Sequence, residues 1–315
     1  MTSLQSKIVI SAIRNRHLFK FHLKPDVITD EASTLQFRRD IEKSTQRNNQ
    51  LPRGIESTKI EIQGLPEGLQ AEWIHPAGTA SLPTKEEKAI FYTHGGGYIS
   101  GNCDDHRLIV SHFVQSTGIG ALLYDYRLAP EFPFPAAMED TLMVYKWLLS
   151  QGVNAQNIQI VGESAGGGLC LASLLAIRDT GLALPRAALA FSPWLDLKST
   201  SPSFTSNAHK DISTLGSWNV WGPFYFGKND PENPWISPLY GDLKGLPPIM
   251  IQVGDYEIML DDSIQFANKA KEVGVEITLH VWPEMVHCFP LLAPLFPEAT
   301  AAWNESIRFL LNHFE

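Results

Sequence analysis

A serine stands between two glycines at residues 162–166, which read GESAG. The strand-like run IQIV at 158–161 comes directly before it, and a helical pattern follows at once. A strand, a sharp turn and a helix in this order place the serine hydroxyl on an exposed, strained corner called a nucleophile elbow. Gly162 and Gly166 are expected there because a side chain at either position would collide with the neighbouring strand and helix. The segment therefore predicts that Ser164 is a nucleophile.

Three consecutive glycines follow another apolar run, and residues 94–97 read HGGG. Glycines let the backbone approach a substrate closely and turn its N–H groups toward it. In acyl transfer negative charge develops on the carbonyl oxygen, and we expect the N–H groups of Gly96, Gly97 and Ala165 to stabilise it. A phosphate-binding loop would instead need a Lys-Ser or Lys-Thr pair at the start of the next helix, and residues 98–100 (YIS) supply none.

A serine hydroxyl is a weak nucleophile at neutral pH and needs a base. The chain has ten histidines. His287 is the best placed of them, because it follows the last predicted strand and comes after both the nucleophile and the candidate acids. His94 is expected to brace its own glycine loop, and the neighbouring Cys288 is expected to be a packed thiol.

The third member of such a triad is a carboxylate that orients the imidazole and stabilises its positive charge. It should lie in the loop after the strand predicted at 249–253, where Asp255, Glu257, Asp261 and Asp262 are available. Asp261 and Asp262 are expected to open the next helix and cap its free N–H groups. Asp255 and Glu257 remain, and their spacing alone does not separate them.

The elements that must position these residues alternate along the chain. Continuous apolar runs that predict strands lie at 89–92, 121–124, 158–161, 187–191, 249–253 and 277–281. Helical patterns separate most of these runs, and an alternating hairpin at 59–62 and 71–74 precedes them. Such a pattern predicts an α/β protein with a mostly parallel sheet that helices cover on both faces.

Two segments depart from that alternation. Residues 1–48 are helical and amphipathic. Between about 198 and 235 the chain is rich in Pro, Gly, Ser and Trp. A connection of that length predicts a functional insertion or lid.

Composition excludes several classes of protein. The net charge of −9 argues against nucleic acid as a partner and against attraction to anionic membranes. Three cysteines in 315 residues argue against a disulfide framework. The N-terminus has no signal-peptide core, and no apolar stretch reaches spanning length. We expect a cytoplasmic protein, with a leaderless export route as the alternative, that uses no metal and no cofactor.

Together the motifs resemble those of the bacterial hormone-sensitive-lipase-like esterases of the α/β-hydrolase superfamily. The matching segments are HGGG at 94–97, YDYRLAPE at 124–131, GESAGG at 162–167, SPWLD at 192–196, ISPL at 236–239 and the late His287. The resemblance implies an α/β-hydrolase fold with a helical cap. Residues 1–48 would form the first part of the cap, and residues 49–315 would form the catalytic domain with a cap insertion at about 198–235.

The resemblance also bears on the acid. Many relatives read Tyr-Asp-Pro-Leu-Arg-Asp in this loop, with the first Asp catalytic. Residues 256–261 here read YEIMLD, so the matching position is Glu257. A glutamate can replace an aspartate in this role. The resemblance thus favours Glu257, and Asp255 stays as the alternative acid.

A serine carboxylesterase that cleaves short- to medium-chain esters through an acyl-enzyme is the activity that the resemblance implies. The pocket for a small apolar ester is expected to draw on Tyr98, Trp218, Trp221 and Phe224. A lactone, amide or drug-ester hydrolase could use the same triad. A non-catalytic small-ligand receptor of the same fold is the other alternative, although such receptors typically lose the histidine. The sequence leaves room for a homodimer through the edge of the last strand.

Overall fold

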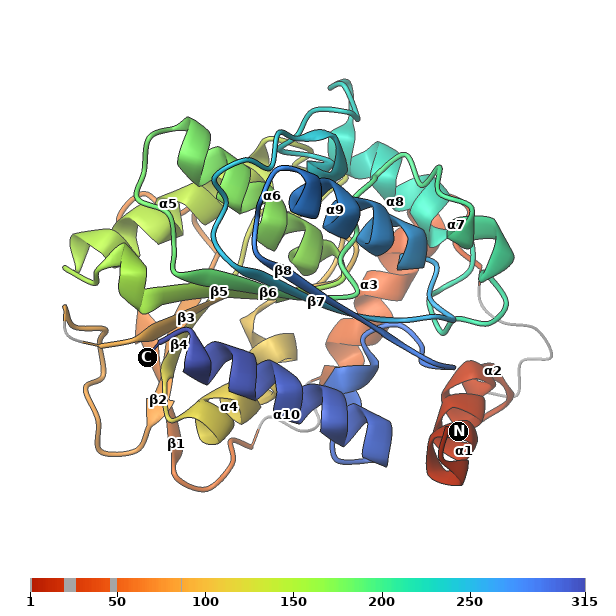
Figure 1. The fold of residues 1–315 in the computed structure, drawn as a ribbon, viewed down its shortest axis with the longest axis horizontal. Helices are drawn as coiled ribbons and strands as arrows, with labels where there is room; N and C mark the ends of the chain where they lie inside the picture. Colours follow the sequence, from red (N-terminus) through yellow and green to blue (C-terminus); the bar gives the residue numbers. More distant parts are fainter. Residues whose placement is uncertain (1, 20–26, 46–49, 86, 315) are drawn as a thin grey trace.

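The computed structural model describes residues 2–19, 27–45, 50–85 and 87–314. An eight-stranded sheet with the order β1-β2-β4-β3-β5-β6-β7-β8 forms its centre (Figure 1). The strands are β1 Ile55–Ile60, β2 Ala71–Pro76, β3 Ala89–Thr93, β4 Gly120–Tyr124, β5 Ile158–Glu163, β6 Ala187–Phe191, β7 Ile249–Gly254 and β8 Ile277–Trp282. Strands β3 to β8 pair in parallel, and β2 pairs antiparallel with both β1 and β4. The predicted α/β-hydrolase sheet is confirmed.

Helices cover both faces of the sheet (Figure 1). On one face lie α4 Cys103–Thr117 and α10 Pro297–Asn312, and on the other lie α5 Ala136–Ser150, α6 Ala165–Asp179 and α9 Leu260–Glu272. Alternate residues of one strand serve the two faces. Ile90 belongs to the apolar core under α4 and α10, and Phe91 belongs to the core under α5 and α6. Both faces of the sheet are buried under helices, which is why these strands appear in the sequence as continuous apolar runs.

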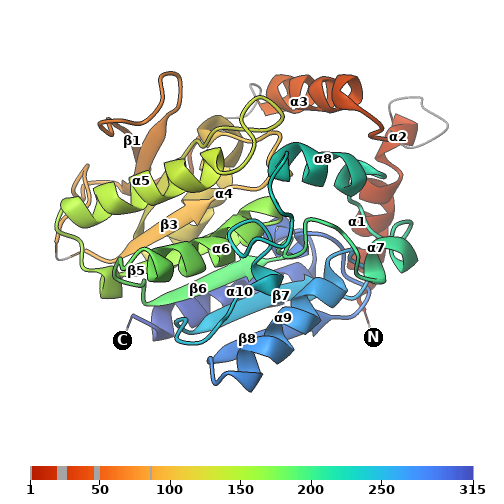
Figure 2. The ribbon, with the colours of Figure 1, turned by 90° about the horizontal axis from the view of Figure 1, so that it is seen from above.

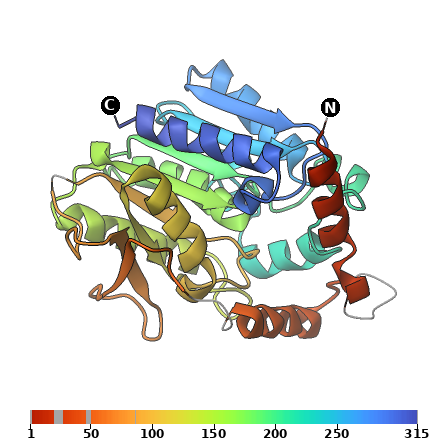
Figure 3. The same cartoon turned by 90° about the horizontal axis from the view of Figure 1, so that it is seen from below.

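The remaining α-helices gather beyond the carboxyl ends of the parallel strands (Figures 2 and 3). They are α1 Leu4–Arg14, α2 Arg16–Phe19, α3 Glu31–Thr45, α7 Ser203–Ser206 and α8 Ser217–Phe226, and we call them the cap. Two chain segments far apart in sequence therefore lie side by side. Residues 1, 20–26 and 46–48 of the predicted cap lie outside the described residues.

Side chains of α3 and α8 join the two parts of the cap. Trp221 donates its indole N–H to Thr34 Oγ1 at 3.1 Å, and its ring centroid lies 5.1 Å from that of Phe37. Short 3-10 turns at Ala155–Asn157, Pro238–Tyr240 and Phe289–Leu292 complete the structure. Within the described residues, no helix is both long and apolar enough to cross a membrane.

Candidate active site

Ser164 forms the turn between β5 and α6, with φ 57° and ψ −124°. A positive φ is uncommon for a residue with a side chain, and it marks the strained corner that the sequence predicts. The flanking glycines allow the turn. A Cβ on Gly162 would lie 2.3 Å from Thr93 Oγ1, and one on Gly166 would lie 2.2 Å from the Thr93 carbonyl oxygen. The hydroxyl of Ser164 faces a cavity of about 360 Å³.

His287 and Glu257 complete a chain of contacts to this serine. His287 Nε2 lies 2.9 Å from Ser164 Oγ, and its Nδ1 lies 3.4 Å from Glu257 Oε2. The other carboxylate oxygen of Glu257 accepts the main-chain N–H of Gly254 at 2.6 Å. The Glu257 side chain is fully buried. Loops after β5, β7 and β8 thus bring Ser164, Glu257 and His287 together.

The other carboxylates of the acid loop face elsewhere. Asp255 accepts the main-chain N–H of Glu284 at 2.5 Å. Asp261 accepts that of Ser203 at 2.8 Å, and Asp262 also bonds the connection between β6 and β7. The prediction that Asp261 and Asp262 cap their own helix is wrong, since α9 starts at residue 260 with no side-chain cap. These carboxylates fasten neighbouring loops instead.

A further carboxylate, Asp211, holds the acid loop and the histidine loop together. Its two oxygens accept the main-chain N–H groups of His287 at 2.9 Å and Ile258 at 3.1 Å. The side-chain amide of Asn207 donates to the carbonyl of Glu257 at 2.9 Å. Sequence reasoning missed both residues. They lie in the irregular 198–235 stretch, where no periodicity or motif marks them.

The charges of this cluster shift the proton affinities of its members. Burial raises the pKa of Glu257 above its ordinary value, although His287 opposes the shift. Burial lowers the pKa of His287, but Cys288, Glu257 and Asp211 outweigh it and raise that pKa well above 6.5. The imidazolium form is therefore stabilised, as a base that takes the serine proton requires.

The backbone of the glycine loop lines the same cavity. Gly96 and Gly97 adopt φ of 113° and 67°, conformations that suit glycine. A Cβ on Gly97 would lie 2.3 Å from the Trp221 ring. Among the described residues, neither N–H of this pair has a hydrogen-bond acceptor. Ala165 begins α6, so its N–H has no acceptor within the helix. The structure thus leaves all three predicted donors available to a ligand.

Comparison with known proteins agrees with this geometry. The model of the α/β-hydrolase fold family matches residues 90–291. An acetyl-hydrolase of Streptomyces hygroscopicus is 37% identical over 76% of this chain and 79% of its own length. An esterase of Acinetobacter venetianus is 34% identical over 75% of this chain and 81% of its own length.

Solved structures cover the whole chain. The crystal structure of an esterase from the bacterial hormone-sensitive lipase family has a TM-score of 0.85 and 36% identity, and the match covers 100% of both chains. That of EstE5 soaked with p-nitrophenyl butyrate has a TM-score of 0.86 and 35% identity over 99% of each chain. The chain belongs to the bacterial hormone-sensitive-lipase-like esterases of the α/β-hydrolase family.

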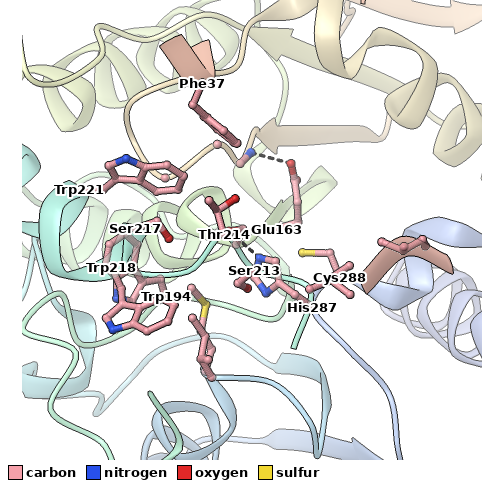
Figure 4. A pocket seen from close by; sticks show the side chains of 18 of the residues that line it. Phe37, Glu163, Trp194, Ser213, Thr214, Ser217, Trp218, Trp221, His287 and Cys288 are labelled. Atoms are coloured by element: carbon pink, nitrogen blue, oxygen red, sulfur yellow. Dashed lines mark hydrogen bonds between the residues drawn. The ribbon is translucent and has the colours of Figure 1, made fainter. Parts of the chain in front are cut away.

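In this hormone-sensitive-lipase-like chain, the cavity beside Ser164 has aromatic walls (Figure 4). Trp218 and Trp221 line it, as the sequence predicts. Tyr98 and Phe224 do not, which corrects the prediction for these two residues. Tyr98 is buried behind the glycine loop, where its ring stacks on another tyrosine, Tyr225, with centroids 3.7 Å apart. Phe224 packs against the apolar core instead.

Other lining residues of this family member were not anticipated. Trp194 comes from the loop after β6, Ile258 and Met259 from the acid loop, and Phe37 from α3. Figure 4 shows Phe37 entering from the cap, on the far side of the cavity from His287 and Cys288. Their aromatic or apolar character is visible in the sequence, but only the fold reveals which of many such residues face the serine. The described residues contain no group of three or more His, Cys, Asp or Glu side chains that could hold a metal ion.

Proposed function

We propose that this chain hydrolyses short- to medium-chain carboxylic esters through an acyl-enzyme on Ser164, with His287 as base and Glu257 as acid. The observation that carries the proposal is the 2.9 Å contact between Ser164 Oγ and His287 Nε2, at a cavity that Gly96 and Gly97 also line. The names of the relatives, an acetyl-hydrolase and esterases, support a serine carboxylesterase.

Acylation is the first half of the proposed reaction. His287 takes the proton of the Ser164 hydroxyl as Oγ attacks the ester carbonyl. Negative charge moves to the carbonyl oxygen, where the N–H groups of Gly96, Gly97 and Ala165 stabilise it. Protonated His287 then gives its proton to the leaving alcohol, and the acyl group stays on Ser164.

Deacylation repeats the same steps with water. His287 removes a proton from the water that attacks the acyl-enzyme, the same three N–H groups bind the second oxyanion, and the acid leaves as Ser164 recovers its proton. Glu257 accepts a hydrogen bond from the Nδ1–H group of the imidazole throughout. It fixes the tautomer and stabilises the positive charge.

The size of the cavity supports a small ester. Its volume of about 360 Å³ is near the lower end of the roughly 300–1,000 Å³ typical of small-molecule sites. An outer cavity of about 750 Å³ shares Arg16, Phe37, Ile212, Ser213 and Thr214 with it. We assign residues 1–48 and about 198–235 to a cap that forms these walls. The smaller cavity would take the acyl group, and the outer one would take longer substituents.

Location and assembly are finer proposals. Cys103, Cys170 and Cys288 are free thiols, which fits a reducing cytoplasm. Strand β8 stands at the edge of the sheet, where a second copy could pair with it. Neither nucleic acid nor anionic membrane suits a net charge of −9.

Initial rates on p-nitrophenyl acetate, butyrate, octanoate and palmitate test the proposal. Ser164→Ala should lower kcat by about 10⁵-fold or more, and wild-type rates should be highest on the two shorter chains. Retained activity in Ser164→Ala would overturn the assigned nucleophile. If no ester is cleaved while an amide or lactone is, the triad serves a different bond.

A further inference from the structure

Glu163, which directly precedes the nucleophile, carries a buried carboxylate that the proposed triad does not use. Its side chain is 5% exposed. One oxygen accepts the main-chain N–H of Gly95 at 2.6 Å, and the other accepts the Tyr92 hydroxyl at 2.5 Å. Figure 4 shows the Gly95 contact as a dashed line that joins the elbow to the glycine loop.

A third partner of the carboxylate is a histidine. His106 Nε2, from α4, lies 3.0 Å from the same oxygen of Glu163 that Gly95 bonds. The other ring nitrogen of His106 lies 3.2 Å from the Asn102 carbonyl oxygen. Burial lowers the pKa of His106, but Glu163 and Asp105 outweigh burial and raise it above its ordinary value. A buried carboxylate is tolerated when it is paired and hydrogen-bonded in this way.

The neighbouring His94 differs from His106, because its pKa is lowered and not raised. Its ring stacks on Tyr126 with centroids 4.1 Å apart and lies 5.1 Å from that of His106. Burial, followed by the charge of His106, lowers the pKa of His94 to about 3. His94 is therefore neutral, and its Nδ1 lies 2.8 Å from the Gly95 carbonyl oxygen. The Tyr126 hydroxyl donates to the His94 carbonyl at 2.7 Å, so the loop is held from both sides.

Position and charge both matter here. Gly95 immediately precedes the two glycines that present N–H groups to the cavity, and a Cβ on Gly95 would lie 2.9 Å from Glu163 Oε1. The carboxylate thus sets the distance between the loop and the elbow. An isolated negative charge beside a developing oxyanion would oppose catalysis. A His106 imidazolium would remove that penalty, because the pair is then neutral overall.

We propose that Glu163 is the positioning residue of the oxyanion hole and that His106 is its counter-ion. Glu163 fixes Gly95 and, through it, Gly96 and Gly97 against the elbow, while His106 cancels the charge of the carboxylate. The proposal rests on the proposed function, since it concerns the oxyanion donors of that reaction.

Variants at Glu163 separate position from charge. Glu163→Ala removes the tether and should lower kcat by about 10²-fold with KM within about threefold, because a misplaced oxyanion donor weakens only the transition state. Glu163→Gln keeps an oxygen for Gly95 and should lose less than Glu163→Ala. Glu305→Gln is the matched control. It alters another His–Glu contact, to His280 at 2.5 Å, in residues that do not line the cavity, and it should keep wild-type kcat.

Variants at His106 test the counter-ion. His106→Leu leaves Glu163 charged and should lower kcat by about tenfold or more, and the double variant His106→Leu/Glu163→Gln should recover most of that loss. In Glu163→Ala the acidic limb of the pH profile, which His287 sets, should keep its position.

The two proposals fail in different ways. Unchanged kcat in Glu163→Ala, or a double variant no better than His106→Leu, would overturn this inference alone. Circular dichroism and thermal unfolding of each variant show whether it is folded, and Glu163→Gln carries the test if Glu163→Ala is not. Ester hydrolysis by Ser164→Ala would overturn the proposed function first.

Discussion

Buried carboxylates at the carboxyl edge of the sheet accept main-chain N–H groups of the loops around the cavity, whereas α3 of the cap is fastened beside the glycine loop by the half-buried side chain of Arg38. Glu257 bonds the end of its own strand, Asp211 bonds two loops, and Glu163 bonds the glycine loop. Such contacts fix the backbone on which the proposed catalytic groups depend.

The cap is held differently. Arg38 of α3 donates to the carbonyl oxygens of Ile99 at 2.6 Å and Ala129 at 2.7 Å, and it pairs with Glu131 at 2.7 Å. Partly exposed contacts of this kind are weak, because solvent competes with them. The contrast indicates a division of work. We propose that the buried carboxylates hold the geometry of bond cleavage and that α3 influences which substrate reaches the cavity.

The largest effect of a substitution should come at Glu257, the proposed acid of the triad. In Glu257→Gln the amide oxygen must still accept the Gly254 N–H, so the amide nitrogen faces Nδ1 of His287 and favours the wrong tautomer. We expect kcat to fall by about 10³- to 10⁴-fold. Asp255→Asn is the control, since its side-chain oxygen can keep the bond to Glu284, and its kcat should stay within about threefold. The reverse ranking would make Asp255 the acid.

The pH profile tests the same cluster without mutation. The base must be neutral, so kcat/KM should fall as pH drops through the pKa of His287. That pKa is raised above 6.5, so the midpoint should lie above this value, with a loss approaching tenfold per pH unit below it. Initial rates with p-nitrophenyl butyrate, read at the isosbestic wavelength of the product, give the midpoint. Flat activity between pH 5 and 8 would contradict the role of His287.

A smaller effect is expected from the cap. Arg38→Gln removes a tether of α3 and should raise KM by about three- to tenfold, equivalent to roughly 1 kcal/mol, while kcat changes by less than about threefold. Arg39→Gln is the matched control, because Arg39 bonds only Gln36 of its own helix among the described residues. Steady-state kinetics on the acetate and octanoate esters measure both constants. A large fall in kcat would show that the cap also shapes the catalytic geometry.

Local sequence patterns explain which parts of the fold and of the site can be predicted. Strands buried on both faces read as continuous apolar runs, and the helical pattern predicted directly after the serine motif matches α6 Ala165–Asp179. The elbow and the glycine loop are readable because local backbone geometry demands glycine there. Short-range constraints therefore determine most of the fold and place Ser164 and His287 at the same edge of the sheet, after β5 and β8.

Contacts between distant segments leave no such pattern. Asp211 bonds the main chain of His287 across 76 positions, and His106 meets Glu163 from a helix whose amphipathic pattern does not mark it. Tyr98 follows the glycine loop directly, but it turns into the core. Which aromatic residues line a cavity depends on the relative placement of whole elements, so the sequence predicts an apolar pocket better than it predicts the residues that form it.

The smallest expected effect is on thermal stability. It concerns Asp262, a buried carboxylate that holds two loops at the edge of the sheet. Asp262 accepts the N–H of Asp196 at 3.0 Å and lies 2.5 Å from the Ser201 hydroxyl. Burial raises the pKa of Asp262 from 3.8 to about 7. Between these values the folded state binds more protons at this site than the unfolded state, so the contribution of Asp262 to stability falls as pH rises.

Asp262→Asn removes that titration and keeps both contacts, because the amide oxygen can accept the Asp196 N–H and the amide nitrogen can donate to Ser201. Its Tm relative to wild type should therefore rise between pH 5 and pH 8, while kcat for p-nitrophenyl butyrate stays within about threefold of wild type. Thermal unfolding followed by circular dichroism at both pH values measures the difference. A Tm difference that is constant with pH would show that Asp262 does not change its charge in this range. The side chain would then hold the loops in a single protonation state throughout this range.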